Sequence, residues 1–335
     1  MSAVALDLIW AGILAIAVFA YVVMDGFDLG IGMLFPWLAV GEERDDAMNS
    51  IAPFWDGNET WLVLGGGGLL AAFPMAYAII LPATYPLIIA MLLGLILRGV
   101  AFEFRWRKVA HRKYWDAAFS TGSFVAATAQ GLILGAVLQG IKVQDHAYAG
   151  GWLDWLSPFS LLSGAGLALG YALSGATWLV WKTHGSIQER ARRMSTRLAV
   201  ATLGAIVAVS AATPFLQYNY WQRWLAVPGI FFAAQVPLLV AIIAALLFLA
   251  LKRRTERIPF FAVLALFFVT FVGLGISVFP YLVPARVTLW DAAAPVQSLQ
   301  FMLEGTAIIL PLILAYTAWA HWVFRGKVAA QGYHE

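Results

Sequence analysis

Four acidic residues fall in or beside apolar stretches of the sequence, where ionisable side chains are costly. Asp25 and Asp28 lie three residues apart, and Asp56 and Glu59 repeat this spacing. Residues three apart on an α-helix share a face, and a charge within a membrane is by default a functional candidate. Carboxylates crowded in a low dielectric can exchange protons near neutral pH, and Arg98 would keep one of them ionised. The residues therefore predict a proton-handling cluster.

A structural interpretation of the same residues stays open. Arg98 and Glu103 mark the end of a third apolar stretch, so the arginine could neutralise acids on two neighbouring helices and hold three helices together. A purely structural tie would hardly need four carboxylates, which favours proton handling.

The elements that must position these residues are nine apolar runs, each long enough for the roughly 20 residues that a bilayer core requires. They cover residues 5–36, 52–73, 75–99, 115–139, 158–181, 197–217, 228–251, 258–280 and 299–324. The predicted fold is an all-α integral membrane protein of nine transmembrane helices. We expect two four-helix bundles and one peripheral helix, in a single polytopic domain over residues 1–335.

The composition supports a lipid environment. Hydrophobic residues make up 62% of the 335 residues and charged residues only 12%, against roughly 25% charged in a soluble domain. A net charge of +3 is expected to report membrane orientation here and does not point to nucleic acid. The absence of cysteine excludes disulfides, thiolate metal sites and a cysteine nucleophile.

Basic residues predict the orientation of the chain. By the predicted spans, 18 of the 21 lysines and arginines lie on one side, and Lys142, Arg223 and Arg286 lie on the other. The positive-inside rule then places the N-terminus outside and the C-terminus in the cytoplasm. The first residues, MSAVALDLIW, lack the basic start of a cleavable signal, so we expect the first run to stay as a membrane helix.

Two further polar or flexible features have mainly structural interpretations. Gly65 to Gly68 form an uninterrupted run, which favours close helix packing, either within the chain or against a partner. Gln300 and Glu304 share a face of the last span, where Glu304 is expected to line a polar contact or to pair with Arg286.

Histidine placement argues against a heme held by this chain alone. His111 and His184 fall in loops on the predicted inner side and His146 in an outer loop, while His321 lies near the inner end of the last span and His334 in the tail. Without two histidines facing each other at mid-membrane depth, a bis-histidine heme is not expected. Met24 and Met91 could ligate iron in principle, but membrane methionines more often serve in packing.

Several segments, in order along nearly the whole chain, resemble subunit II of cytochrome bd-type ubiquinol oxidases. The first two blocks together are highly specific for that family. The matching segments are YVVMDGFDLGIGM (21–33), PFWDGNETWLV (53–63) with GGGGLLAAFP (65–74), ILRGVAFEFR (96–105), TLWDAAAP (288–295) and LAYTAWAHWVFRGKV (314–328). The short length and the outer-loop sequences are most similar to the cyanide-insensitive variant.

The resemblance implies a bacterial inner-membrane complex in which this chain stabilises subunit I. Subunit I of the family carries the b-type hemes and the d-type heme, oxidises quinol and reduces dioxygen to water with protons drawn from the cytoplasm. Some members carry only b-type hemes, so the heme type stays open. The family's second subunit resembles the first in fold, with nine helices, and normally binds no heme. A structural quinone and a small single-helix accessory subunit are further possibilities in such complexes.

The polar cluster and the resemblance together suggest a mechanism. Asp56, supported by Asn58 and Glu59, would relay protons from the cytoplasm toward subunit I. Asp25, Asp28 and Arg98 would tune the relay and hold its water, with Glu103 at the inner end of the path.

Two rival functions make different predictions. A secondary transporter would carry polar groups or broken helices near the bilayer midplane, often in repeats, whereas the acids here cluster toward one side. A scaffold subunit without a proton role would show assembly defects, but no specific rate defect, when Asp56 is neutralised.

Overall fold

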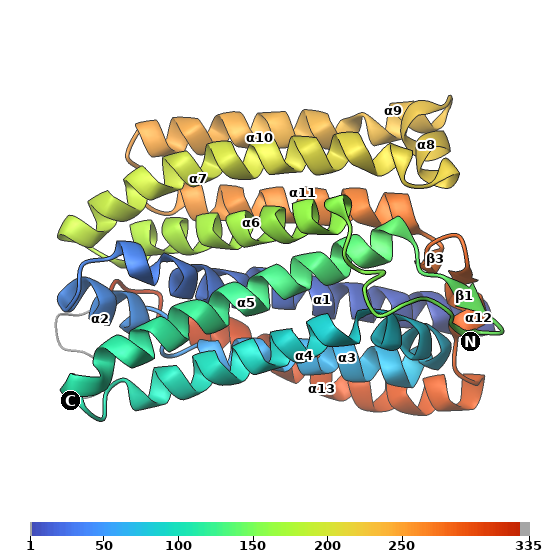
Figure 1. Cartoon of the computed structure of the whole chain (residues 1–335), viewed down its shortest axis with the longest axis horizontal. Helices are drawn as coiled ribbons and strands as arrows, with labels where there is room; N and C mark the ends of the chain where they lie inside the picture. Colours follow the sequence, from blue (N-terminus) through green and yellow to red (C-terminus); the bar gives the residue numbers. More distant parts are fainter. Residues whose placement is uncertain (1, 329–335) are drawn as a thin grey trace.

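Long helices running along one common axis build the molecule in the computed structural model, which describes residues 2–328 (Figure 1). Eight helical segments in this part of the chain are long and apolar enough to cross a membrane. Their main helices are α1 (Ala3–Leu34), α4 (Pro74–Phe104), α5 (Arg112–Gln139), α6 (Pro158–Lys182), α7 (Gly185–Ala212), α10 (Gln235–Lys252), α11 (Ile258–Val278) and α13 (Val296–Val323).

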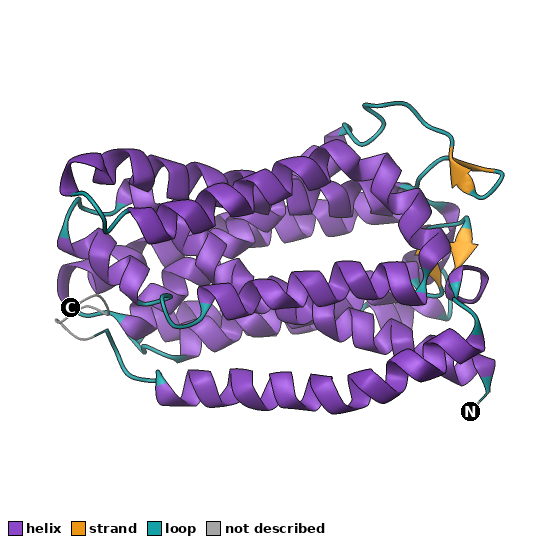
Figure 2. Ribbon diagram, turned by 90° about the horizontal axis from the view of Figure 1, so that it is seen from below, coloured by secondary structure: helices purple, strands orange, loops and turns teal. Residues whose placement is uncertain are grey.

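Short elements lie at the two ends of the long axis. One end, which we call the α2 end, holds α2 (Glu42–Asn49); the other, the hairpin end, holds two small β-hairpins (Figures 1 and 2). The remaining elements are β1 (Val143–Gln144), β2 (Ala147–Tyr148), β3 (Tyr281–Val283), β4 (Val287–Thr288), α8 (Tyr218–Leu225), α9 (Gly229–Ala233), α12 (Leu289–Ala292) and the 3₁₀ turns Phe35–Trp37, Val109–His111 and Thr213–Phe215.

The predicted second span is a helix, α3 (Trp55–Ala72), but it differs from the other eight in composition. Its first turns are polar and glycines fill its middle, so by composition it is not counted with the eight apolar segments. Its 18 residues extend about 27 Å at 1.5 Å per residue, close to the roughly 30 Å of a bilayer core.

One predicted loop is helical. The basic segment 182–197 was expected as a loop, yet α7 begins at Gly185 and continues without interruption to Ala212. Ile187, Ala191 and Ser195 lie at helical spacing and are buried, so this extension has an apolar face that packs inward. Arg193 and Arg197 are exposed on this extension, whereas Arg192 is buried, an arrangement that a count of basic residues does not reveal.

Helices α1, α5 and α6 form the centre of the packing. Helix α1 contacts α3, α5 and α6; α5 lies between α4 and α6; and α6 also contacts α7 and α11. Small residues allow this close approach. A Cβ added at Gly30 of α1 would lie 1.9 Å from the carbonyl oxygen of Tyr171 in α6, and one added at Gly94 of α4 would lie 2.7 Å from the carbonyl oxygen of Gly122 in α5.

The glycine run at 65–68 contributes little to this internal packing. A Cβ at Gly68 would lie 2.6 Å from Leu14, and one at Gly65 would make only an ordinary contact with Val18. Gly66 and Gly67 have no heavy atom of the described chain within 4 Å of such a Cβ. The run therefore leaves part of α3 open, and the tight helix contacts form elsewhere.

Candidate functional site

A buried arginine joins the three helices that carry the predicted acids. Arg98 of α4 is 1% exposed, and its Nη1 donates to Oδ1 of Asp25 at 2.6 Å. Its Nη2 donates to Oε1 of Glu59 on α3. Asp25 is fully buried, whereas 29% of the Glu59 side chain is exposed. The cluster therefore extends from the interior of the bundle to its surface.

Asn58 of α3 links Asp28 of α1 to this cluster of Asp25, Glu59 and Arg98. Its Nδ2 donates to Oδ2 of Asp28 at 2.7 Å and to the carbonyl oxygen of Met24 at 3.1 Å. Asp28 is fully buried and Asn58 is 2% exposed. The amide thus fixes the start of α3 against the last turns of α1.

The cluster retains unused hydrogen-bonding capacity. Oδ2 of Asp25, Oδ1 of Asp28 and Nε of Arg98 are buried without a partner among the described residues. Buried polar atoms in folded proteins almost always have a protein or water partner. Three carboxylates and one guanidinium therefore form a polar site that fits bound water or protons.

Two predicted site residues lie outside this cluster. Asp56 is exposed, with no hydrogen bond or ion pair among the described residues, and Glu103 is also exposed. On a helix, residues three apart are rotated by about 60°, and this rotation separates Asp56 from Glu59 at the edge of the bundle. The expectation that all four carboxylates crowd together in one cluster is therefore wrong for Asp56, which is exposed.

A second polar line, absent from the sequence prediction, extends deeper into the bundle. Tyr171 of α6 donates to Oε1 of Gln130 at 2.9 Å, and Nε2 of Gln130 on α5 donates to the Tyr21 hydroxyl at 2.8 Å. Tyr21 stands one turn before Asp25 on α1, on the same face. Gln130 could have indicated this line from the sequence, because a glutamine within an apolar run needs a hydrogen-bond partner.

Beyond Arg98, a charge network closes the α2 end. Arg105 is 1% exposed and donates to Asp116 at 2.5 Å and to Asp45 at 2.6 Å, while Arg44 lies 2.7 Å from Asp116. From the sequence alone, these arginines indicate only the orientation of the chain. All four of these charged residues form ion pairs, so the network is well explained as a structural link that holds α2, α4 and α5 together.

Met91, Gln300 and Glu304 do not belong to the Arg98 cluster. Met91 is buried in an apolar cluster with Leu95, as expected of packing. Gln300 and Glu304 are exposed on α13, and the expected Glu304–Arg286 pair is absent from the described residues. His334 lies outside them.

Comparison with known proteins identifies the relatives of this chain. The family described as cytochrome bd terminal oxidase subunit II matches residues 6–324. The chain is 30% identical to cytochrome bd-I ubiquinol oxidase subunit 2 of Escherichia coli strain K12, with 97% of this chain and 96% of that protein covered. It is 28% identical to cytochrome bd ubiquinol oxidase subunit 2 of Bacillus subtilis strain 168, with 96% of each covered.

A solved structure shares the fold. A chain of the bd oxidase from Geobacillus thermodenitrificans superposes with a TM-score of 0.77 at 18% identity, covering 96% of this chain and all of that chain. At this identity the likeness concerns the arrangement of helices.

Proposed function

Because the chain belongs to the cytochrome bd terminal oxidase subunit II family, we propose that it stabilises subunit I and contributes a proton path from the cytoplasm. Membership places it in an oxidoreductase complex of the respiratory membrane. The complex would oxidise two quinols to two quinones while one dioxygen takes up four electrons and four protons to form two waters. The observation that carries the proton role is the buried Arg98 cluster with its unpartnered carboxylate oxygens.

We infer that the hemes of the complex lie outside this chain. His111, His146 and His184 are exposed at the two ends of the molecule, and the His321 ring is stacked on Phe54 with 4.4 Å between ring centroids. Three of the four described histidines are thus outside the interior of the bundle, so we place the b-type and d-type hemes on subunit I.

In the proposed path, protons reach the cluster from the surface of α3. Asp56 is exposed at the start of α3, and Glu59, one turn further, bonds Arg98. Asp25 and Asp28 lie behind it in the interior. The site holds three carboxylates and one arginine, so it can take up a proton, and the exposed position of Asp56 suits transfer between subunits. Glu103 would lie beside the inner opening.

The face that subunit I would cover lies on α3 and α13. Glu304 and Gln300 are exposed on α13, and a charge facing lipid is costly. Gly66 and Gly67 leave α3 open to close approach by another helix. Charged, amide and glycine positions together suit a protein partner better than lipid.

We further propose that α3 is the ninth span and that the N-terminus faces outward. Two four-helix bundles with one peripheral helix stay a prediction, because α6 packs against α1 and α5 as well as against α7. The α2 end, rich in arginine, would then face the cytoplasm of a bacterial inner membrane. The cyanide-insensitive type, a structural quinone and an accessory subunit stay predictions.

The test is Asp56→Asn in the assembled oxidase, with Asp145→Asn as the control for an exposed acid at the hairpin end. A relay role predicts that turnover with quinol and dioxygen falls roughly tenfold or more, while both subunits still co-purify with their hemes. A scaffold role predicts loss of assembly without a specific rate defect. Normal turnover and normal assembly in Asp56→Asn would remove Asp56 from the path.

A further inference from the structure

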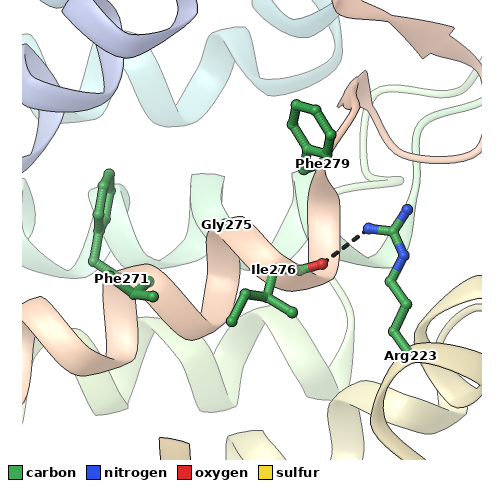
Figure 3. Close-up of a pocket in the computed structure, with 6 residues that line it drawn as sticks. Arg223, Phe271, Gly275, Ile276 and Phe279 are labelled. Atoms are coloured by element: carbon green, nitrogen blue, oxygen red, sulfur yellow. Dashed lines mark hydrogen bonds between the residues drawn. The ribbon is translucent and has the colours of Figure 1, made fainter. Parts of the chain in front are cut away.

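A groove runs along the last turns of α11 at the hairpin end. It is shallow and widely open, with a volume of about 630 Å³ and an almost wholly apolar lining that includes Phe271, Val272 and Phe279. Figure 3 shows Phe271 and Phe279 rising from the same side of α11, with Gly275 between them. Val272 and Phe279 are 40% and 53% exposed. The groove is therefore an apolar surface open to its surroundings.

One charged residue, Arg223 of α8, stands at the end of this groove (Figure 3). Its Nη1 donates to the carbonyl oxygens of Ile276 at 2.9 Å and Ser277 at 3.0 Å. The neighbouring Trp224 donates from Nε1 to the Ser277 hydroxyl at 2.8 Å, which fixes α8 against the end of α11. The guanidinium is thus held at the groove by neutral groups only.

The charge of Arg223 has no acidic partner within residues 2–328. A guanidinium has five N–H donors, and the two carbonyl bonds use only Nη1. Nε and Nη2 make no hydrogen bond to the described chain. These two nitrogens form the planar fork that binds the oxygens of a phosphate in pairs.

We propose that this groove binds an anionic phospholipid of the leaflet at the hairpin end, with its phosphate on Arg223 and an acyl chain along α11. Charge complementarity decides between lipids, because a zwitterionic headgroup brings its own cation and leaves the arginine less fully compensated. Tyr218 and Trp221 of α8 are 73% and 41% exposed, as is typical of aromatic residues at headgroup depth. With the proposed orientation, this is the outer leaflet.

Gly275 offers a probe of the groove that leaves the protein's own packing intact. A Cβ added there would have no heavy atom of the described chain within 4 Å, so the side chain of Gly275→Leu starts in open space and extends into the groove. Gly204 on α7 has the same open surroundings away from the groove, and Gly204→Leu is the matched control. Arg223→Gln removes the charge. Because that variant can also lose the contact between α8 and α11, Gly275→Leu tests the groove without changing Arg223.

The experiment uses the purified two-subunit oxidase in nanodiscs of phosphatidylcholine with a minor fraction of phosphatidylglycerol, followed by native mass spectrometry. We expect the wild type and Gly204→Leu to retain one phosphatidylglycerol in preference to phosphatidylcholine. Arg223→Gln should weaken this retention by roughly tenfold, the effect of losing about one charge-assisted contact, and Gly275→Leu should weaken it by occupying the acyl-chain position. Equal retention of the two lipids, equal retention in all four proteins, or a quinone or polypeptide protected in the groove would overturn the proposal.

Discussion

At the residue scale, Arg98 is a charged side chain held almost wholly inside the bundle. Its side chain is 1% exposed and joins Asp25, which is fully buried, to Glu59. Removing one partner of a buried ion pair leaves an uncompensated charge and costs about 3–5 kcal/mol. We therefore expect Arg98→Gln to lower the free energy of unfolding by about this amount, measured by thermal unfolding and by the yield of assembled complex.

A double variant separates charge from shape at this site. Asp25→Asn removes the carboxylate that Arg98→Gln leaves unpaired, so the double variant should recover most of the stability lost in the single variant. If the double variant is as unstable as the sum of the two single variants, the Arg98–Asp25 pair does not carry the coupling.

The sequence predicted this cluster only in part, and the reason is geometric. The spacing of Asp25 and Asp28 and the position of Arg98 were enough to predict that they lie together. Asp56 was expected to join them, yet it is exposed, because which side of α3 faces α1 depends on packing. Gln130 indicated a polar contact within the membrane, but its partner, Tyr21, could be identified only from the structure.

At the element scale, the crossing of α1 and α6 depends on Gly30. A Cβ at this position would lie 1.9 Å from the Tyr171 carbonyl oxygen, so Gly30→Ala must push the two helices apart. Overpacking of this kind costs about 1–3 kcal/mol. Gly12→Ala on the same helix meets no atom within 4 Å and should leave the thermal midpoint of the complex unchanged or slightly raised. Similar midpoints for the two variants would contradict the predicted close crossing.

Helix α2 is tied to α7 through Glu43, and this tie predicts a pH dependence. Burial alone would raise the pKa of Glu43, but the Ala39 N–H and the Ser186 hydroxyl, each at 2.8 Å, and Arg190 at 2.9 Å outweigh it and lower the pKa below its ordinary value of 4.5. A lowered folded-state pKa gives stability that is present above pH 4.5 and is lost as the pH falls through the folded value.

The variant Glu43→Gln tests this sign. At pH 7 it should be less stable than the wild type by about 1–2 kcal/mol, the size of a charge-assisted hydrogen bond. The difference should shrink as the pH falls below 4.5, measured as thermal midpoints across a pH series. A difference that grows toward low pH would mean that the carboxylate is not the stabilised form.

Helix positions were predicted better than helix ends. An apolar run identifies α10 or α11 because lipid imposes one simple requirement on its length and composition. The start of α7 at Gly185 was missed because its first turns lie beyond the apolar run and are stabilised by a narrow buried face. Helix α3 is the opposite case, since its polar start and its glycines suit contacts with α1 and with a partner.

At the scale of the whole molecule, the number of crossings and the orientation are coupled, and α3 decides both. Val40 follows α1 and Lys108 follows α4. They lie on the same side of the membrane only if α3 crosses it, because α3 then takes the chain across the membrane and α4 brings it back. Gln144, in the hairpin after α5, must lie on the opposite side.

The absence of native cysteine allows this arrangement to be tested with single-cysteine variants of the tagged complex. A membrane-impermeant maleimide should label Gln144→Cys in intact spheroplasts, and Val40→Cys and Lys108→Cys only after permeabilisation. All three positions are exposed, so burial does not confuse the result. Labelling of Lys108→Cys but not Val40→Cys from outside would show that α3 does not cross, and labelling of both without Gln144→Cys would reverse the orientation. The Arg98 cluster would then open toward the outer face, and uptake of protons from the cytoplasm would be excluded.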